Sequence, residues 1–214
     1  MSLVIRSVGA FAILQGVLLA APAVLSSPDK GPSAAKAVHA VATPQSCLAQ
    51  EPSGADPADV AACHHVALEL AGQRDFDRAI AIESTLFERQ PANAEVATAL
   101  AQMQETGRKD VVQALKMYHE ALYASPGYPA ALLGLGIHWK ARGESRIAER
   151  YFARGAKENP QQPIFQVRLA EVLIDAGRAE EATPILQAVA ERFPGTGEAD
   201  DARRLMSRTS LARP

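Results

Sequence analysis

The side chains best suited to chemistry in this sequence are two cysteines and five histidines. His64 and His65 are adjacent, so on a helix their side chains point about 100° apart and cannot bind one metal ion together. The pair Cys63-His64 matches the end of a haem-attachment motif, but Val60 stands where that motif requires another cysteine. We therefore expect no metal site and no cofactor.

We find no catalytic motif. The sequence contains no glycine-rich phosphate loop, no HExxH, no nucleophile elbow and no CxxC. The carboxylate pairs Glu180-Glu181 and Asp200-Asp201 fall where helices are expected to start, and acidic side chains there interact favourably with the helix dipole. The sequence thus predicts a protein that is not an enzyme.

Cys47 and Cys63 have a structural use available to them. A disulfide between them would close a loop of about 16 residues and contribute about 3 kcal/mol on the chain-entropy estimate. It would fix the segment before the first helices to the rest of the fold. The bond requires an oxidising compartment, and two free thiols are the alternative.

Composition favours a helical protein without nucleic-acid partners. Of 214 residues, 48% are hydrophobic and only 5% aromatic, and the surplus of alanine and leucine favours helix over strand. The 22 lysines and arginines against 24 aspartates and glutamates leave a net charge of −2. Nucleic-acid binding needs a basic stripe or a high isoelectric point, so we exclude that class of partner.

Residues 1–25 have the features of an export signal. Arg6 precedes the apolar run VGAFAILQGVLL (8–19), and Ala21-Pro22-Ala23 offers the small residues that signal peptidase requires. An uncleaved signal anchor is the alternative, because the uncharged residues 7–28 can just span a bilayer core of about 30 Å. In both cases Arg6 stays in the cytoplasm and everything after it is exported.

The expected compartment is the periplasm. Alanine- and arginine-rich usage resembles that of a high-GC bacterium, so we expect a periplasmic protein, either released or anchored in the inner membrane and facing the periplasm. Membrane contact would then be limited to residues 7–25.

Residues 26–57 are expected to be a flexible tether. They hold five prolines among alanine, serine and threonine, and no helical or strand periodicity runs through them.

From residue 58 onward the sequence repeats at intervals of 34 or 35 residues. Two ladders keep step at spacings of 35, 34 and 34: Pro91, Pro126, Pro160 and Pro194, and Ala79, Ala114, Ala148 and Ala182. Between each alanine and its proline lies an amphipathic helix, preceded by another helix. In the third unit these helices are 145–157 and 130–142, separated by Gly143. Each unit is therefore a helix, a tight turn and a helix that ends at a proline.

These units resemble tetratricopeptide (TPR) repeats. The unit 129–162 fits that family's pattern best, with Leu132, Leu135-Gly136 and Trp139 on its first helix, then Ala148, Phe152 and Pro160. Small residues such as Gly136 and Ala148 let the two helices approach closely. The resemblance implies an all-α fold, a right-handed TPR superhelix of four helix-turn-helix repeats and a C-terminal closing helix.

The repeats are expected within a domain spanning 58–208, at about 60–93, 94–128, 129–162 and 163–196, with the closing helix at 198–207 and a tail at 209–214. The first repeat departs from the family pattern. Cys63 stands where a bulky residue belongs, and Glu83 where an aromatic one belongs. The second carries one extra residue, most simply in the turn 105–110.

With no reaction to assign, function is expected at a surface. On each first helix, four positions point away from the second helix at about 100° per residue, and the resemblance implies that they line a concave groove. With Arg168 at its margin, the candidate groove residues are His64, Leu68, Thr98, Gln102, Leu133, Ile137, Lys140, Val167, Arg168, Glu171 and Ile174.

Part of this groove is expected to be an apolar strip with polar markers beside it. The strip is Leu133, Ile137, Val167 and Ile174, and the markers are Lys140, Arg168 and Glu171. Such a strip suits an amphipathic helix or an apolar extended peptide. Packing against the neighbouring repeat is the alternative. The Lys/Asn/Arg set of chaperone-binding TPR proteins is not visible.

The leading hypothesis is a non-enzymatic TPR adaptor or scaffold that binds a protein or peptide segment in its concave groove, within a bacterial envelope assembly or biogenesis complex. The alternative is a membrane-anchored structural subunit of a larger membrane protein complex.

Overall fold

The computed structural model describes residues 42–49 and 57–211. The expected signal segment 1–25, most of the expected tether 26–57 and residues 212–214 lie outside the described residues. Within the described ranges, no helix is long and apolar enough to cross a membrane.

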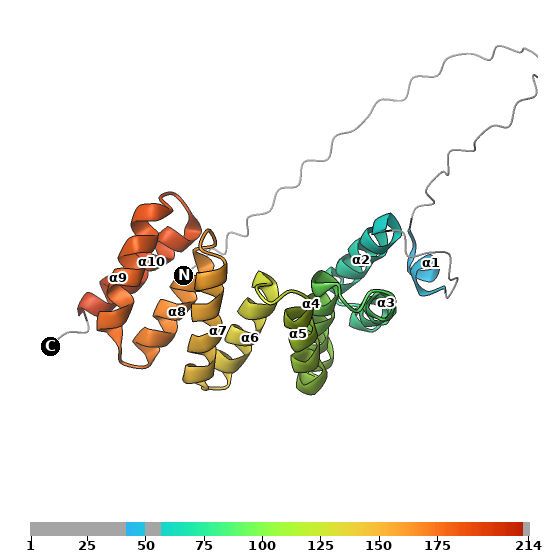
Figure 1. Ribbon diagram of the computed structural model, residues 1–214, viewed down its shortest axis with the longest axis horizontal. Coiled ribbons are helices and arrows are strands. Elements are labelled where there is room, and N and C mark those ends of the chain that lie inside the picture. Colours follow the sequence, from blue (N-terminus) through green and yellow to red (C-terminus); the bar gives the residue numbers. More distant parts are fainter. Residues whose placement is uncertain (1–41, 50–56, 212–214) are drawn as a thin grey trace, which may run out of the picture. The chain divides into compact units, whose positions relative to one another are not determined.

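The described residues are helical and contain no strand (Figure 1). Four helix pairs follow one another between a short first helix and a closing helix. In chain order the elements are α1 (Pro44–Leu48), α2 (Pro57–Gly72), α3 (Phe76–Arg89), α4 (Ala94–Met103), η1 (Gln104–Arg108), α5 (Val111–Ala124), α6 (Pro129–Ala141), α7 (Ser145–Glu158), α8 (Ile164–Asp175), α9 (Ala179–Arg192) and α10 (Gly197–Leu211). Each pair packs against the next, as expected for an all-α solenoid.

The turn inside each pair has one residue in the left-handed conformation, at the same place in all four pairs. These residues are Arg74, Lys109, Gly143 and Gly177, with φ angles of 66°, 59°, 78° and 77°. Glycine adopts this conformation readily, whereas a side chain makes it less favourable by about 1–2 kcal/mol. The helix pair therefore imposes its turn even where the sequence offers arginine or lysine.

The extra residue of the second repeat is accommodated in η1. This segment is a π-helical turn at the end of α4, and a π-turn holds one more residue per hydrogen bond than an α-turn. Its Gly107 packs so closely against Phe76 of α3 that an added Cβ would collide with the ring. The turn thus restores the repeat spacing and also places Glu105 beside the next repeat.

Close packing within and between pairs depends on small residues. A Cβ at Gly136 would collide with the ring of Phe152, and one at Gly155 with the ring of Phe165. Both rings are completely buried. Gly136 thus lets α6 approach α7, and Gly155 lets α7 approach α8. The core needs both close approaches to reach normal packing density.

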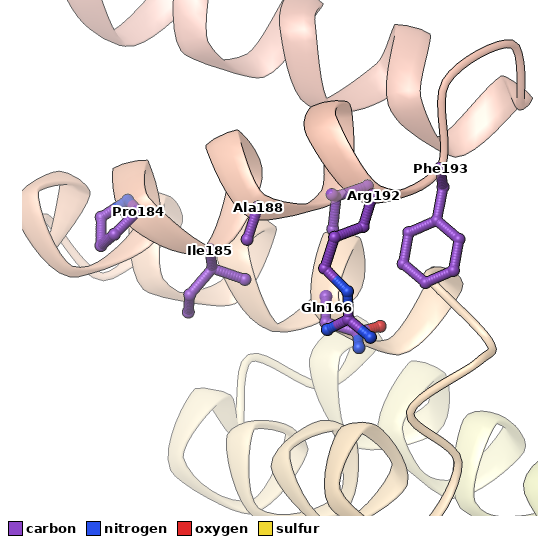
Figure 2. A pocket seen from close by; sticks show the side chains of 7 residues that line it. Gln166, Pro184, Ile185, Ala188, Arg192 and Phe193 are labelled. Carbon is purple, nitrogen blue, oxygen red and sulfur yellow. The ribbon is translucent and has the colours of Figure 1, made fainter.

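α9 has one apolar side that is partly open to solvent. Pro184, Ile185 and Ala188 lie along this side, and Arg192 and Phe193 lie at its end (Figure 2). Together with Gln166 and Val189 they line a hollow of about 350 Å³.

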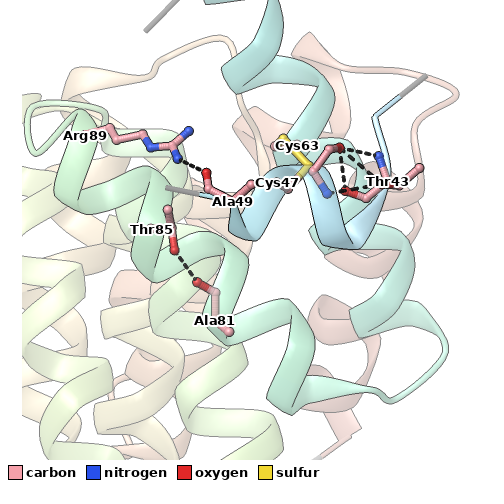
Figure 3. Close-up of a disulfide and its surroundings, with 8 residues drawn as sticks. Thr43, Cys47, Ala49, Cys63, Ala81, Thr85 and Arg89 are labelled. Carbon is pink, nitrogen blue, oxygen red and sulfur yellow. Dashed lines mark hydrogen bonds between the residues drawn. A yellow bond between two sulfur atoms is a disulfide. The ribbon is translucent and has the colours of Figure 1, made fainter. Parts of the chain in front are cut away.

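α1 is attached to the first helix pair by a disulfide. Cys47 and Cys63 are bonded, with their Cα atoms 5.5 Å apart (Figure 3). The guanidinium of Arg89 on α3 donates a hydrogen bond of 3.0 Å to the carbonyl of Ala49. Thr43 and Ser46 form a capping box at the start of α1.

Residues 42–49 therefore differ from the flexible tether expected over 26–57. They fold because the disulfide and the cap hold a helix that is too short to be stable alone. Cys47 is completely buried as a result.

Candidate functional site

A cavity of about 360 Å³ lies between α6 and α8. Elsewhere the first helices of successive pairs pack on one another, α2 on α4 and α4 on α6, and α8 packs on α10. The cavity is lined by Ile137, Lys140, Ala141, Phe152, Arg168 and Glu171. Four of these, Ile137, Lys140, Arg168 and Glu171, are candidate groove residues. The structure therefore brings two candidates of the third repeat, Ile137 and Lys140, together with two of the fourth, Arg168 and Glu171, in a single site.

Ile137 is the apolar side chain that this cavity presents to solvent. It is 48% exposed, which is high for an isoleucine, whereas Phe152 in the same cavity is completely buried. An exposed isoleucine above a buried aromatic ring offers a place for one apolar side chain of a partner.

The polar side of the cavity is a charge-balanced network. The ammonium of Lys140 on α6 lies 3.0 Å from Glu171 and 3.3 Å from Asp175, both on α8. Arg168 also bonds Glu171, at 3.0 Å. Burial alone would raise the pKa of Glu171, but the hydrogen bonds from Arg168 and Lys140 lower that pKa below its usual value. Two cations, Lys140 on α6 and Arg168 on α8, therefore balance two carboxylates, Glu171 and Asp175 on α8.

One donor in this network is unused. The Nε of Arg168 is buried and has no hydrogen-bond partner among the described residues. A buried donor without an acceptor is unfavourable by about 1–3 kcal/mol.

Leu133 and Ile174 do not line the cavity but pack against the two cores. Leu133 packs against the core that runs from α1 to α8, and Ile174 against the core of α8 to α10. Both are half-buried, so each offers only part of its side chain to a partner.

Thr98 and Val167 do not reach the surface. Val167 is completely buried in the core of α8 to α10. Thr98 is 3% exposed, and its hydroxyl donates to the carbonyl of Ala94 at 2.7 Å. The expected strip of four apolar residues is therefore reduced to Ile137 with parts of Leu133 and Ile174.

The remaining candidates lie on the first two repeats. Leu68 on α2 is 44% exposed and Gln102 on α4 is exposed. His64 instead faces inward: its Nδ1 lies 2.7 Å from Oε1 of Glu83, a completely buried carboxyl group, and its Nε2 lies 3.6 Å from Glu95. It serves packing and hydrogen bonding within the first repeat.

A second buried histidine was not among the candidates. His138 on α6 is 6% exposed, and its Nδ1 lies 2.6 Å from Oε1 of Glu105 in η1. The hydroxyl of Tyr118 donates to the other oxygen of Glu105 at 3.3 Å. Burial raises the pKa of Tyr118, and so does the nearby Glu105, which keeps this phenol protonated as a donor. Since 33 residues separate His138 from Glu105, no local pattern could have indicated the pair.

Among the residues that the structure describes, no three His, Cys, Asp or Glu side chains are grouped so that they could hold a metal ion.

Two sequence-family models match the chain, both described as tetratricopeptide repeat, one over residues 67–129 and the other over residues 141–208. No curated protein matches the chain significantly.

Solved structures similar to this chain include TPR proteins. TTC0263, a thermophilic TPR protein of Thermus thermophilus, has a TM-score of 0.57 and 23% identity, covering 71% of this chain and 82% of that one. The pilF protein of Pseudomonas aeruginosa has a TM-score of 0.60 and 15% identity, covering 71% and 69%. YrrB, a TPR protein with an unusual peptide-binding site, has a TM-score of 0.54 and 19% identity, covering 74% and 81%. At these identities the likeness shows the fold.

Proposed function

The chain belongs to the tetratricopeptide repeat family, and from that premise we propose that it is a non-enzymatic adaptor whose α6–α8 cavity binds a segment of another protein. TPR proteins are generally interaction scaffolds, and YrrB, which shares the fold, has a peptide-binding site. The partner is a protein or peptide segment.

The observation that carries the proposal is the 48% exposed Ile137 in the same cavity as the guanidinium of Arg168, whose side chain is 37% exposed. An apolar side chain of the partner would cover Ile137, and a backbone carbonyl next to it would accept from Arg168. A peptide carries apolar side chains and backbone carbonyls close together. An extended or amphipathic segment could therefore supply both groups. The charge balance around Glu171 gives no net attraction for a strongly charged ligand.

Site-specific photo-crosslinking in the native cell tests this function. A photoreactive residue at position 137 should capture one discrete protein, and the same residue at Asp201 on α10 should not. The captured protein is then purified and titrated against the wild type, Ile137→Glu and Leu68→Glu. We expect Ile137→Glu to weaken binding at least tenfold and Leu68→Glu, equally exposed but on α2, to leave it unchanged. Equal capture from both positions, or none from position 137, contradicts the proposal.

We also propose that the adaptor works in the bacterial envelope, as part of an assembly or biogenesis complex. Two features support this location: the export signal that the sequence predicts at residues 1–25, and the Cys47–Cys63 disulfide, a bond that persists in oxidising compartments. The alternative, a membrane-anchored structural subunit, depends on residues 7–25 remaining attached. Washing membranes at high pH separates the two, because a cleaved adaptor is released and an anchored subunit stays.

A further inference from the structure

The outer face of α7 carries cations that nothing in the described chain neutralises. Arg146, Arg150 and Lys157 are exposed, and no described acidic group lies within ion-pairing distance of them. The two acids of α7 are already used. Glu149 lies 2.8 Å from Arg178 and Glu158 lies 3.0 Å from Arg154. α7 therefore presents a one-sided positive stripe, although the whole chain has a net charge of −2.

Arg178 identifies the sides of α7 and α9 that face each other. This N-cap residue of α9 bonds Glu149 of α7 at 2.8 Å and Glu181 of α9 at 2.6 Å. Glu149 and Glu181 therefore both point into the space between the two helices.

The apolar hollow on α9 lies on this same side of the helix. Ile185, Ala188 and Arg192 follow Glu181 at intervals of four, seven and eleven residues, which places them within about 40° of it around the helix axis. Figure 2 shows Ile185, Ala188 and Arg192 projecting from α9 toward the neighbouring helices. The guanidinium of Arg192 lies 5.4 Å from the centre of the Phe193 ring at the end of the hollow.

The cations of α7 lie along the outer rim of this space, on the exposed side of the helix. Around the axis of α7, Arg146 is about 60° and Lys157 about 80° from Glu149, and Arg150 follows at about 100°. Ala153, at about 40°, is the small residue between them. The space between α7 and α9 thus has an apolar wall on α9 and a positive outer rim on α7.

We propose that this α7–α9 surface binds an amphipathic helix with an acidic face, as a second protein-binding site separate from the α6–α8 cavity. The apolar residues of the helix would enter the hollow over Ile185 and Ala188. Its carboxylates would pair with Arg146, Arg150 and Lys157. The stripe from Arg146 to Lys157 extends about 16 Å along α7, so it matches a partner helix of about three turns.

A helix fits this surface better than an anionic membrane. Membrane-surface binding needs apolar side chains that project into the bilayer, and the large exposed hydrophobic residues of the described chain are Leu48, Leu68, Val112, Tyr123 and Ile137. None of them lies on α7 or α9. The apolar groups between α7 and α9 line a hollow, which can receive side chains but cannot insert into lipid.

Methyl NMR on the full chain tests the proposal directly. The probe is a synthetic helical peptide of about 14 residues, or four turns, with leucines on one face and glutamates on the flanking faces. A matched peptide carries lysine in place of each glutamate. In isoleucine-methyl-labelled protein, Ile185 reports on the α7–α9 surface and Ile137 on the α6–α8 cavity. We expect the acidic peptide to shift the Ile185 methyl signal and to leave that of Ile137 unchanged, with an affinity that falls as salt is added.

Charge reversal provides the matched variants. The triple substitution R146E/R150E/K157E should weaken binding of the acidic peptide at least tenfold, while R146K/R150K should keep it within about threefold, because lysine preserves the charge. Ile137→Glu should have no effect, which separates this proposal from the proposed function. Since the three cations have no described partners, the reversed protein should unfold at the same temperature as the wild type.

Four outcomes would overturn the inference. These are no shift at Ile185, equal binding of the lysine peptide, equal binding to the charge-reversed variant, or shifts confined to Ile137. Binding of phosphatidylglycerol vesicles that is lost in the charge-reversed variant, without any peptide-induced shift at Ile185, would identify a membrane site instead.

Discussion

His64 on α2 and Glu83 on α3 share a partly buried hydrogen bond, with 2.7 Å between Nδ1 and Oε1. The hydrogen bond to Glu83 raises the pKa of His64 above its ordinary 6.5. Burial raises the pKa of Glu83 above its ordinary 4.5. Both shifts favour a pair that keeps one proton, so the two groups together carry no net charge in the interior of the first repeat.

Stability is expected to fall as the pH rises above about 6.5. The unfolded chain releases the histidine proton there, whereas the folded pair keeps it because the pKa of His64 is raised. The folded state then binds more protons than the unfolded state, so linkage lowers the free energy of unfolding until His64 titrates in the folded protein. Urea unfolding at a series of pH values from about 6 to about 9, the range in which histidine titrates, measures this loss of stability.

Two variants assign that pH dependence to the pair. Glu83→Gln removes the partner that raises the pKa of His64, so its stability should be nearly independent of pH in the same range. His119→Gln changes an exposed histidine on α5 and should retain the wild-type slope. A wild-type profile as flat as that of Glu83→Gln would show that the pair does not hold the proton.

Breaking the pair should be far more harmful than replacing it. His64→Ala leaves the carboxyl group of Glu83 buried without a partner, and we expect a loss of about 3 kcal/mol. The double variant His64→Leu/Glu83→Leu removes both polar groups and should recover most of that loss, because apolar residues often replace a buried pair without penalty. Chemical denaturation of the three proteins checks this, and a double variant less stable than His64→Ala would contradict it.

The same pair shows what sequence reasoning could and could not reach. Cys63 and Glu83 were identified as departures from the TPR pattern, and each proves to have a specific partner, Cys47 and His64. The departures were visible because the 34-residue spacing fixed the expected residue at each position. The partner of Cys63 could be predicted because the sequence holds only one other cysteine. The partner of Glu83 depends on how α2 lies against α3, which no spacing records.

The prediction of the groove residues was incomplete for a similar reason. A single-helix wheel separates the side that faces the second helix from the opposite side, but it does not tell solvent from a neighbouring repeat. Val167 and Ile137 both satisfy the wheel, yet one is completely buried and the other 48% exposed. The difference arises because α8 packs on α10 while a cavity separates α6 from α8.

Glycine at the two non-glycine turn positions should stabilise the protein. Arg74 and Lys109 have the positive φ that Gly143 and Gly177 adopt in the later repeats. Arg74→Gly and Lys109→Gly should each raise the free energy of unfolding by about 0.5–1 kcal/mol, since relief of the backbone strain exceeds the added entropy of the unfolded chain. Thermal unfolding of each variant measures the gain.

The reverse change is the matched control for that prediction. Gly143→Ala should lower stability by about 1 kcal/mol, although its Cβ would meet no neighbouring atom within 4 Å. An unchanged Gly143→Ala protein would mean that the turns relax freely and that positive φ carries no penalty here.

Removing the disulfide should destabilise the first repeat and leave the last one intact. The bond closes a loop of 16 residues, for which the chain-entropy estimate is about 3 kcal/mol. Cys47→Ala/Cys63→Ala should therefore release α1 and loosen α2 and α3. In a repeat protein each unit depends on its immediate neighbours, so amide exchange should accelerate in α2 and α3 while α8 and α9 keep their protection.

A second variant separates the covalent bond from the helix that it holds. Arg89→Ala removes the hydrogen bond to Ala49 but leaves the disulfide, and it should accelerate exchange only slightly. Uniform acceleration from α2 to α10 in the cysteine-free protein would mean that the stack unfolds as one unit. Unchanged exchange in α2 and α3 would mean that the other contacts of α1 hold the first repeat without the bond.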